Sequence, residues 1–156
     1  MATQADKAEL FLALHQGAAP LVMPNPWDVG SAKALAAMGF EALATTSGGF
    51  AATLGRIDGS VARDEAVAHA AAVVAAVGVP VSADFENCFA HEPSGVADTI
   101  EVGIAAGLAG CSVEDWDGEA IYGRKTTSMA WMTWPTRSPG CSVTKRPGRT
   151  YSSPPV

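Results

Sequence analysis

Carboxylate side chains follow the apolar segments of this chain at the points where those segments end. Asp84 and Glu86 come directly after one apolar run, Glu114 follows the next, and Asp58 lies some residues beyond an earlier one. Carboxylates gathered at one edge of a fold repel one another unless a cation lies among them. Oxygen ligands suit Mg²⁺, or alternatively Mn²⁺, held partly through waters. The pattern predicts a metal site formed by Asp84, Glu86 and Glu114, with Asp58 as a further candidate whose direction the sequence does not fix.

A Ser-Gly-Gly segment, Ser47, Gly48 and Gly49, follows the apolar run that precedes Asp58. We expect a loop here, with backbone N–H groups that little side chain obstructs, and such a loop can hold a carboxylate or an oxyanion. Most Gly-Gly pairs are only tight turns. Beside a carboxylate-bound metal, however, the loop could help to stabilise an enolate, with the metal on one side and the amides on the other.

Helices and strands must bring these residues to one edge. Apolar spacing and capping residues predict four helices and four strands in alternation. The predicted helices span 7–16, 29–38, 62–77 and 95–106, and the predicted strands span 21–23, 42–45, 79–83 and 108–113. Asp28 and Ser94 are expected to cap the second and fourth helices, and Gly39 to end the second in a left-handed conformation. Some of the other acids could be helix caps too.

Repeated βα units whose strands are apolar on both faces are typical of a parallel sheet covered by helices. An open doubly wound sheet or part of a (β/α)8 barrel would satisfy this α/β pattern. A complete barrel needs about 250 residues, so the 156 residues here could form about the first four βα units. The carboxyl ends of parallel strands share one edge, where ligands bind in these folds.

Composition narrows the class of protein. The chain is 48% apolar and 17% charged, with three cysteines and a net charge of -6. This composition is too apolar for a disordered chain, too poor in cysteine for a disulfide scaffold, and too acidic for a nucleic-acid groove. The amino terminus lacks the pattern of a signal peptide, and residues 66–83 predict a helix and a strand instead of a membrane span. A soluble, cytoplasmic protein without nucleic-acid or membrane partners is expected.

The composition changes abruptly near residue 122. Residues 1–122 contain 4 basic and all 16 acidic side chains, whereas residues 123–156 contain 6 basic side chains and no acidic one. Ser, Thr and Pro dominate the second segment without any helical or strand period. It is interpreted either as a disordered basic interaction tail or as the product of a shifted reading frame. Both interpretations predict a domain over 1–122 and a tail without packed structure over 123–156.

Four segments, in this order, resemble motifs of the isocitrate lyase/phosphoenolpyruvate mutase superfamily. They are residues 20–30 (PLVMPNPWDVG), 43–48 (LATTSG), 81–87 (VSADFEN) and 110–115 (GCSVED), within a resemblance over about 8–122. The resemblance implies a (β/α)8 barrel that binds Mg²⁺ with an α-oxo acid or its enolate. Such enzymes make or break C–C or P–C bonds, and the full-length proteins are expected to form homo-oligomers.

The resemblance also assigns roles by motif. Asp84 matches the principal metal-binding aspartate, and Glu86 and Glu114 match acids that hold the metal mainly through water. Asp58 matches an acid of the same cluster. The Ser47–Gly49 segment matches the catalytic loop whose hydroxyl and amides hold the substrate carboxylate and the enolate oxygen. The implied reaction is that of a Mg²⁺-dependent lyase or mutase acting on a small α-oxo or hydroxy carboxylic acid.

The chain departs from the superfamily pattern in three places. Well-characterised lyases carry a Lys-Lys/Arg-Cys-Gly motif after the fourth strand, whereas residues 116–122 contain neither Lys nor Cys. The sequence is closer to carboxyphosphonoenolpyruvate mutase and 2-methylisocitrate lyase-like proteins. Cys88 stands where a glycine is expected, and the last four strands have no counterpart. Impaired activity is therefore expected. The competing hypothesis is a non-enzymatic α/β fragment that uses its acidic edge to bind a metal or a partner.

Overall fold

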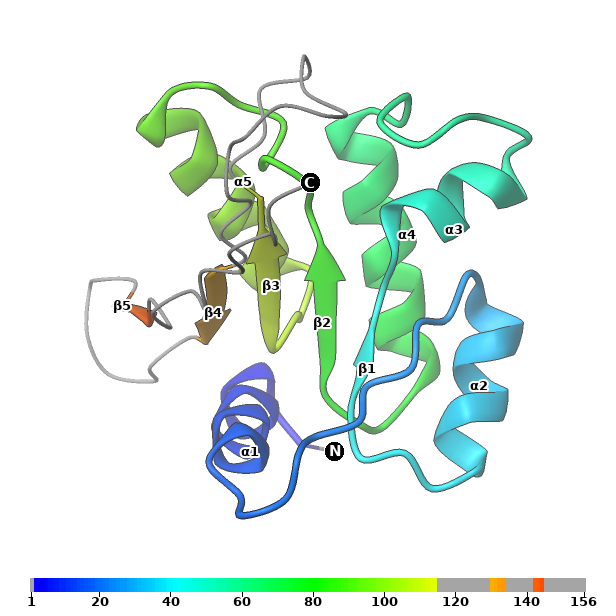
Figure 1. Cartoon of the computed structure of the whole chain (residues 1–156), viewed down its shortest axis with the longest axis vertical. Coiled ribbons are helices and arrows are strands. Elements are labelled where there is room, and N and C mark those ends of the chain that lie inside the picture. Colours follow the sequence, from blue (N-terminus) through cyan, green and yellow to red (C-terminus); the bar gives the residue numbers. More distant parts are fainter. Residues whose placement is uncertain (1, 115–129, 134–141, 145–156) are drawn as a thin grey trace, which may run out of the picture.

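The computed structural model describes residues 2–114, 130–133 and 142–144. These residues form five α-helices and one five-stranded sheet of order β1-β2-β3-β4-β5 (Figure 1). The helices are α1 (Gln4–His15), α2 (Val29–Ala37), α3 (Ser47–Thr53), α4 (Arg63–Ala76) and α5 (Pro93–Ala105). The strands are β1 (Leu43–Ala44), β2 (Val81–Asp84), β3 (Gly110–Val113), β4 (Ala130–Thr133) and β5 (Ser142–Thr144). None of the described helices is long and apolar enough to cross a membrane.

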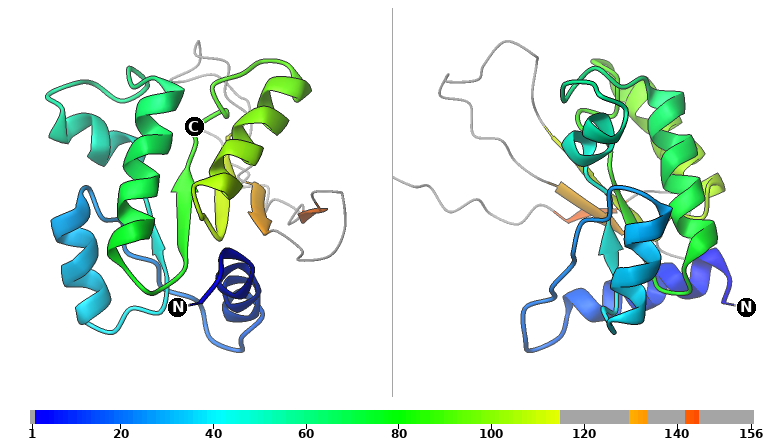
Figure 2. Two further views of the ribbon diagram at one scale, coloured as in Figure 1. Left: turned by 180° about the vertical axis from the view of Figure 1, so that it is seen from behind. Right: turned by 90° about the vertical axis from the view of Figure 1, so that its right-hand side faces the viewer.

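The first three strands are parallel, as the repeated βα pattern predicts. Leu43 pairs with Val81, and Asp84 pairs with Ser112, so the carboxyl ends of β2 and β3 lie side by side. Helices α2, α4 and α5 lie on one face of this sheet, and α1 lies below the amino ends of the strands (Figures 1 and 2). This is a partial α/β arrangement with three parallel strands.

Two apolar clusters hold these layers together. The larger lies between the sheet and its helices, and its bulkiest fully buried side chains include Phe85, Leu43 and Leu108. The smaller contains Phe11 of α1, packed with Ala42 and Ala109 near the amino ends of the strands. Successive residues of β2 and β3 are buried without alternation, in agreement with strands that are apolar on both faces.

Helix ends agree with the sequence at two of three predicted positions. Asp28 caps α2, its Oδ1 accepting a hydrogen bond from the Ser31 N–H at 2.7 Å, and Gly39 adopts φ +93° just beyond that helix. The prediction that Ser94 caps α5 is wrong. That helix begins at Pro93, with Glu92 as its N-cap and no side-chain capping bond. A proline fits the first turn because the N–H that it lacks has no intrahelical partner there.

Two predicted local structures are wrong. Residues 21–23 do not form a strand, although the Pro24 carbonyl accepts a hydrogen bond from Ala44 N–H beside β1. Prolines at 20, 24 and 26 remove the donors that a sheet ladder requires. The count of four βα units is therefore not confirmed. The Ser-Gly-Gly segment is the first turn of α3 instead of a loop, because the Thr46 hydroxyl caps that helix.

The expectation of a tail without packed structure is wrong for two short segments. Strand β4 pairs antiparallel with β3, Val113 opposite Ala130, and β5 pairs antiparallel with β4. An uncovered β3 edge presents unpaired backbone N–H and C=O groups, which another strand satisfies. The rest of 123–156 lies outside the described residues, so the boundary at 122 stays a prediction.

Candidate functional site

The candidate site is built at the carboxyl ends of the parallel strands. Asp84 is the last residue of β2, Glu86 lies two residues beyond it, and Glu114 directly follows β3. The Glu114 N–H donates a hydrogen bond to the Glu86 carbonyl at 2.6 Å, which ties the two loops together. The fold therefore brings three acids to one edge, as the sequence pattern predicted.

Asp84 is the best-anchored side chain of this site. Its Oδ2 accepts a hydrogen bond from the Ser47 N–H at 3.0 Å, and its Oδ1 accepts one from the Glu86 N–H at 3.3 Å. Its own backbone N–H donates to the Thr45 hydroxyl at 3.0 Å. Charge-assisted bonds of this kind hold a carboxylate in one orientation. Asp84 thus joins the end of β2 to the first turn of α3.

The acids lie close enough to perturb one another. Burial, followed by repulsion from Asp58, Asp84 and Glu114, raises the pKa of Glu86 from 4.5 to about 7. Burial is also the main cause that raises the pKa of Glu114, with Asp84 and Asp58 adding to it. Desolvation and like charges both favour the protonated carboxyl, whereas a cation favours the ionised form. A cation bound beside these acids would favour the ionised form that burial and like charges oppose.

Asp58 joins this cluster from the segment between α3 and α4. A Cβ atom built on Gly48 would lie 3.3 Å from Asp58 Oδ2, so the carboxylate lies directly against the first turn of α3. Gly49 has even less room, because an added Cβ would lie 2.5 Å from Thr46 Cγ2 and 2.6 Å from Trp27 Cδ1. These close approaches explain the two glycines, which serve packing at the site.

A metal at this site would have few direct protein ligands. Across residues 2–114 and the two tail strands, no group of three or more His, Cys, Asp or Glu side chains is arranged to hold a metal ion. Mg²⁺ commonly uses one or two carboxylates and keeps several waters. The anchored Asp84 and the desolvated, mutually repelling Glu86 and Glu114 fit such a water-rich site, and they do not fit a closed cage.

Comparisons with known proteins identify the family. The family model for phosphoenolpyruvate phosphomutase matches residues 11–133. The chain belongs to this family. The match extends past residue 122, where the composition changes. Two strains of Mycobacterium tuberculosis, CDC 1551 and H37Rv, each have an uncharacterized protein that is 34% identical over 136 residues, 87% of this chain and 52% of the relative.

Solved structures of the phosphoenolpyruvate mutase/isocitrate lyase superfamily share the fold. A protein of Burkholderia cenocepacia J2315, provisionally named a lyase/mutase, is 50% identical with a TM-score of 0.73, over 78% of this chain and 45% of that one. A 2,3-dimethylmalate lyase is 30% identical with a TM-score of 0.63, over 72% and 38%. An oxaloacetate acetylhydrolase with its product oxalate is 28% identical with a TM-score of 0.64, over 74% and 40%.

The chain spans about half the length of the curated relatives it matches. Family membership therefore covers the part that contains the acid cluster and α3. Residues 116–122, where the Lys- and Cys-containing motif of the well-characterised lyases was expected and not found, lie outside the described residues. The names of two of these structural neighbours are those of a lyase/mutase and of a lyase.

The loop after β2 has an unusual backbone. Glu86, Cys88 and Phe89 have φ values of 49°, 59° and 56°, a left-handed region that residues other than glycine seldom adopt. Cys88 is thus left-handed at the position where a glycine was expected. Its side chain is fully buried, and burial raises the pKa of the thiol to about 11. The thiol is therefore neutral at physiological pH and packs as a small apolar group.

Sequence reasoning missed three residues near the acids. Thr45 anchors the Asp84 backbone, Trp27 packs on Gly49, and His69 of α4 lines a small cavity with Asp84 and Glu86. Thr45 lies within the predicted strand 42–45 and His69 within the predicted helix 62–77, and neither prediction gives these side chains a role at the site. The sequence did contain a signal for Thr45, since its hydroxyl lies at the end of a predicted strand and next to Thr46 and Ser47.

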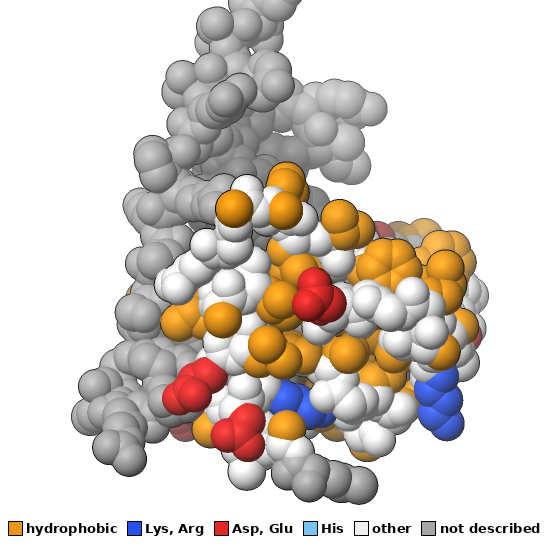
Figure 3. Space-filling model, turned by 90° about the horizontal axis from the view of Figure 1, so that it is seen from below, with side chains coloured by type: hydrophobic (Ala, Val, Ile, Leu, Met, Phe, Trp, Pro, Cys, Tyr) orange, Lys and Arg blue, Asp and Glu red, His pale blue; other side chains and the backbone are white. Residues whose placement is uncertain are grey.

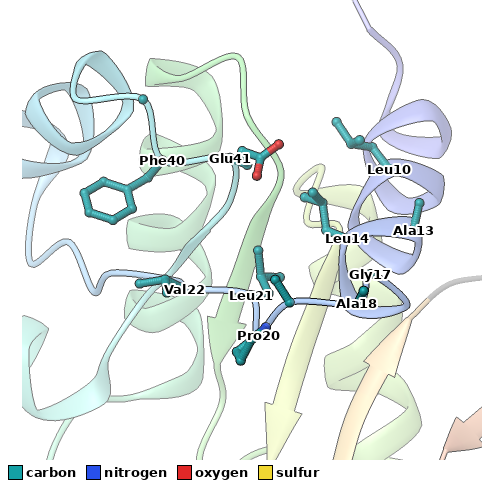
Figure 4. A pocket seen from close by; sticks show the side chains of 12 residues that line it. Leu10, Ala13, Leu14, Gly17, Ala18, Pro20, Leu21, Val22, Phe40 and Glu41 are labelled. Carbon is teal, nitrogen blue, oxygen red and sulfur yellow. The ribbon is translucent and has the colours of Figure 1, made fainter.

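A larger cavity lies at the opposite end of the fold. It has a volume of about 520 Å³, and its lining side chains are mainly apolar, including Leu14, Leu21 and Phe40 (Figure 4). Glu41 is its one ionisable lining residue among the described positions. Hydrophobic side chains gather on this lower face (Figure 3). Because only one ionisable side chain of the described residues lines this cavity, the acidic edge is the better candidate for the active site.

Proposed function

We propose that this family member is part of a divalent-cation-dependent lyase or mutase that acts on a small α-oxo or hydroxy carboxylic acid. The observation that carries the proposal is the convergence of Asp84, Glu86 and Glu114 beside the first turn of α3. The names of its neighbours, 2,3-dimethylmalate lyase and oxaloacetate acetylhydrolase, point to small dicarboxylic acids as the substrate class.

The acids of the site would bind the cation, and the first turn of α3 would bind the substrate. Asp84 would hold the cation, with Glu86 and Glu114 orienting its waters, and Asp58 would add negative charge at the same edge. A bound Mg²⁺ would supply Lewis-acid polarisation of the substrate oxygens. The Ser47 hydroxyl and the Gly48 N–H would hold the substrate carboxylate, because the Ser47 N–H already donates to Asp84.

This arrangement favours an enolate-type intermediate. Negative charge that develops on a substrate oxygen would lie between the cation site and the Ser47–Gly49 turn, where fixed dipoles stabilise it. The nearby cavity of about 370 Å³, lined in part by Asn25, Thr45 and Asp84, is large enough for a small dicarboxylic acid.

A binding experiment tests the proposal without requiring turnover. Oxalate resembles an enolate and should raise the melting temperature of the chain only when Mg²⁺ is present. Ligand at about a hundred times its Kd should stabilise the protein by about 2.7 kcal/mol. Asp84→Asn should abolish the rise in melting temperature with both ligands. Asp98→Asn, on the exposed surface of α5, is the control and should leave that rise unchanged.

The pattern of responses separates the alternatives. Stabilisation by Mg²⁺ without any further effect of oxalate would indicate a metal-binding fragment, the hypothesis that competes with an enzyme. No response to either ligand in the unsubstituted chain would refute the proposed site. An equal response in Asp84→Asn would place the cation elsewhere.

A further inference from the structure

His69 is an ionisable residue close to the candidate site to which the proposed reaction gives no role. It lies on α4, and its ring stacks flat on Phe50 of α3, with ring centroids 3.9 Å apart and an interplanar angle of 8°. Its Nε2 atom is buried and has no hydrogen-bond partner among the described residues. A buried ring nitrogen without a partner is rare because its desolvation is costly. This nitrogen therefore requires an explanation.

His69 is one of the residues that line a small cavity beside the acid cluster. This cavity has a volume of about 10 Å³, and Ser47, Asp84 and Glu86 line it together with His69. About 10–15 Å³ is the smallest space that accepts one water, and a buried water typically makes about three hydrogen bonds. A hydroxyl, two carboxylates and a ring nitrogen supply enough polar partners for a single water.

We propose that His69 Nε2 holds one internal water in this cavity and, with its stack on Phe50, positions α3 over Asp84. The water would bridge the imidazole to the polar groups that face it from α3 and from the loop after β2. His69 is thus a positioning residue that acts on Ser47 through the water and through Phe50. The consequence for cation binding rests on the proposed function, whereas the water and the placement of α3 do not.

The protonation of His69 agrees with this role. Burial lowers the pKa of its imidazole, and the Asp28 carboxylate acts weakly in the opposite direction. A neutral imidazole has one donor and one acceptor nitrogen, so Nε2 can pair with a water in either tautomer. A water beside the carboxylates of Asp84 and Glu86 can donate to one group and accept from another.

Two variants separate the nitrogen from the ring. His69→Phe keeps an aromatic ring for the stack on Phe50 and removes the nitrogen. His15→Phe is the matched control, because His15 lies on α1 and stacks edge-on against Phe11, remote from the acids. In each variant the replaced residue is a histidine on a helix, and its ring packs against a phenylalanine ring.

The first measurement needs no metal. The Ser47 N–H, bonded to Asp84 Oδ2, reports where α3 lies. We expect its hydrogen exchange to become about tenfold faster in His69→Phe and to stay unchanged in His15→Phe. In the unsubstituted chain, a nuclear Overhauser contact between the His69 ring and a long-lived water should be present. Absence of this contact overturns the proposal, even if His69→Phe fails to fold.

The second measurement uses Mn²⁺ as the probe of the acid cluster. Loss of a residue that orients a metal site typically weakens binding tenfold to a hundredfold. We expect the Kd for Mn²⁺ to rise by at least about tenfold in His69→Phe alone. An unchanged Kd together with unchanged Ser47 exchange refutes the role of His69. If the unsubstituted chain binds no Mn²⁺, the proposed function fails, and the water contact and Ser47 exchange still decide the role of His69.

Discussion

Replacing Glu86 by glutamine should stabilise the metal-free protein above neutral pH and leave it almost unchanged in acid. Burial and the charges of Asp58, Asp84 and Glu114 raise the pKa of this carboxyl from 4.5 to about 7. Between about pH 4.5 and pH 7 the folded state therefore binds more protons than the unfolded state. Because the unfolded state binds fewer, the free energy of unfolding falls as the pH rises through the window.

The size of the effect follows from the shift and from the exposure of Glu86. At about 1.4 kcal/mol per pKa unit, the rise from 4.5 to about 7 corresponds to an upper bound of roughly 3.5 kcal/mol. The side chain is only partly buried, and solvent screening reduces such terms. We expect Glu86→Gln to gain about 1–2 kcal/mol at about pH 8 and close to none at about pH 4.

Urea unfolding followed by circular dichroism measures this difference, with the slope m checked for constancy. Glu101→Gln is the matched control, because it removes a carboxylate that is exposed on α5 and lies outside the acid cluster. A gain of the same size at both pH values would refute the electrostatic reasoning. Saturating Mg²⁺ should reverse the ranking at about pH 8, because the cation stabilises the ionised Glu86 that the variant lacks.

Three further substitutions, one of them with a matched control, test the packing. Gly103→Ala places a Cβ 2.9 Å from the buried Phe85 ring and should lower the free energy of unfolding in urea by about 1–2 kcal/mol. Gly78→Ala is the control, because Gly78 has open space around it, and it should not destabilise the protein. Cys88→Gly relieves a left-handed φ of 59° but removes a buried thiol, so its free energy of unfolding should change by less than about 1 kcal/mol. Phe11→Ala empties the smaller core and should cost about 3–5 kcal/mol, measured by thermal unfolding.

Two central segments were predictable from their composition and from the residues at their ends. The predicted helix 62–77 corresponds to Arg63–Ala76, and the predicted strand 79–83 to Val81–Asp84. The helix segment is rich in alanine, a strong helix former, and ends before Gly78, whereas the strand is a continuous run that is buried on both faces. Residues 21–23 were apolar too, but their hydrogen-bonding donors were interrupted by prolines, which apolar content does not reveal.

The candidate site was predictable to the extent that it depends on topology. Placing acids after parallel strands was sufficient to predict that Asp84, Glu86 and Glu114 would meet, because strand ends share an edge. The role of α3 was not predictable, since Ser-Gly-Gly is a poor helix sequence until the Thr46 hydroxyl caps it. The contact of His69 with Phe50 depends on how two helices cross, which local pattern does not specify.

The loop after β2 bears two separate costs at one residue. Glu86 has a left-handed backbone, with φ 49°, and a carboxyl whose ionisation is opposed by burial and by three neighbouring acids. Neither feature stabilises the fold, and a glycine or a neutral side chain would remove one or both of them. Local costs of this kind persist where the surrounding structure enforces them, and they concentrate at functional sites. The bonds that fix Asp84, from Ser47 and from the Glu86 N–H itself, provide that enforcement. A bound cation would convert the electrostatic cost into binding energy, which is the reason that we place the chemistry of this protein at this loop.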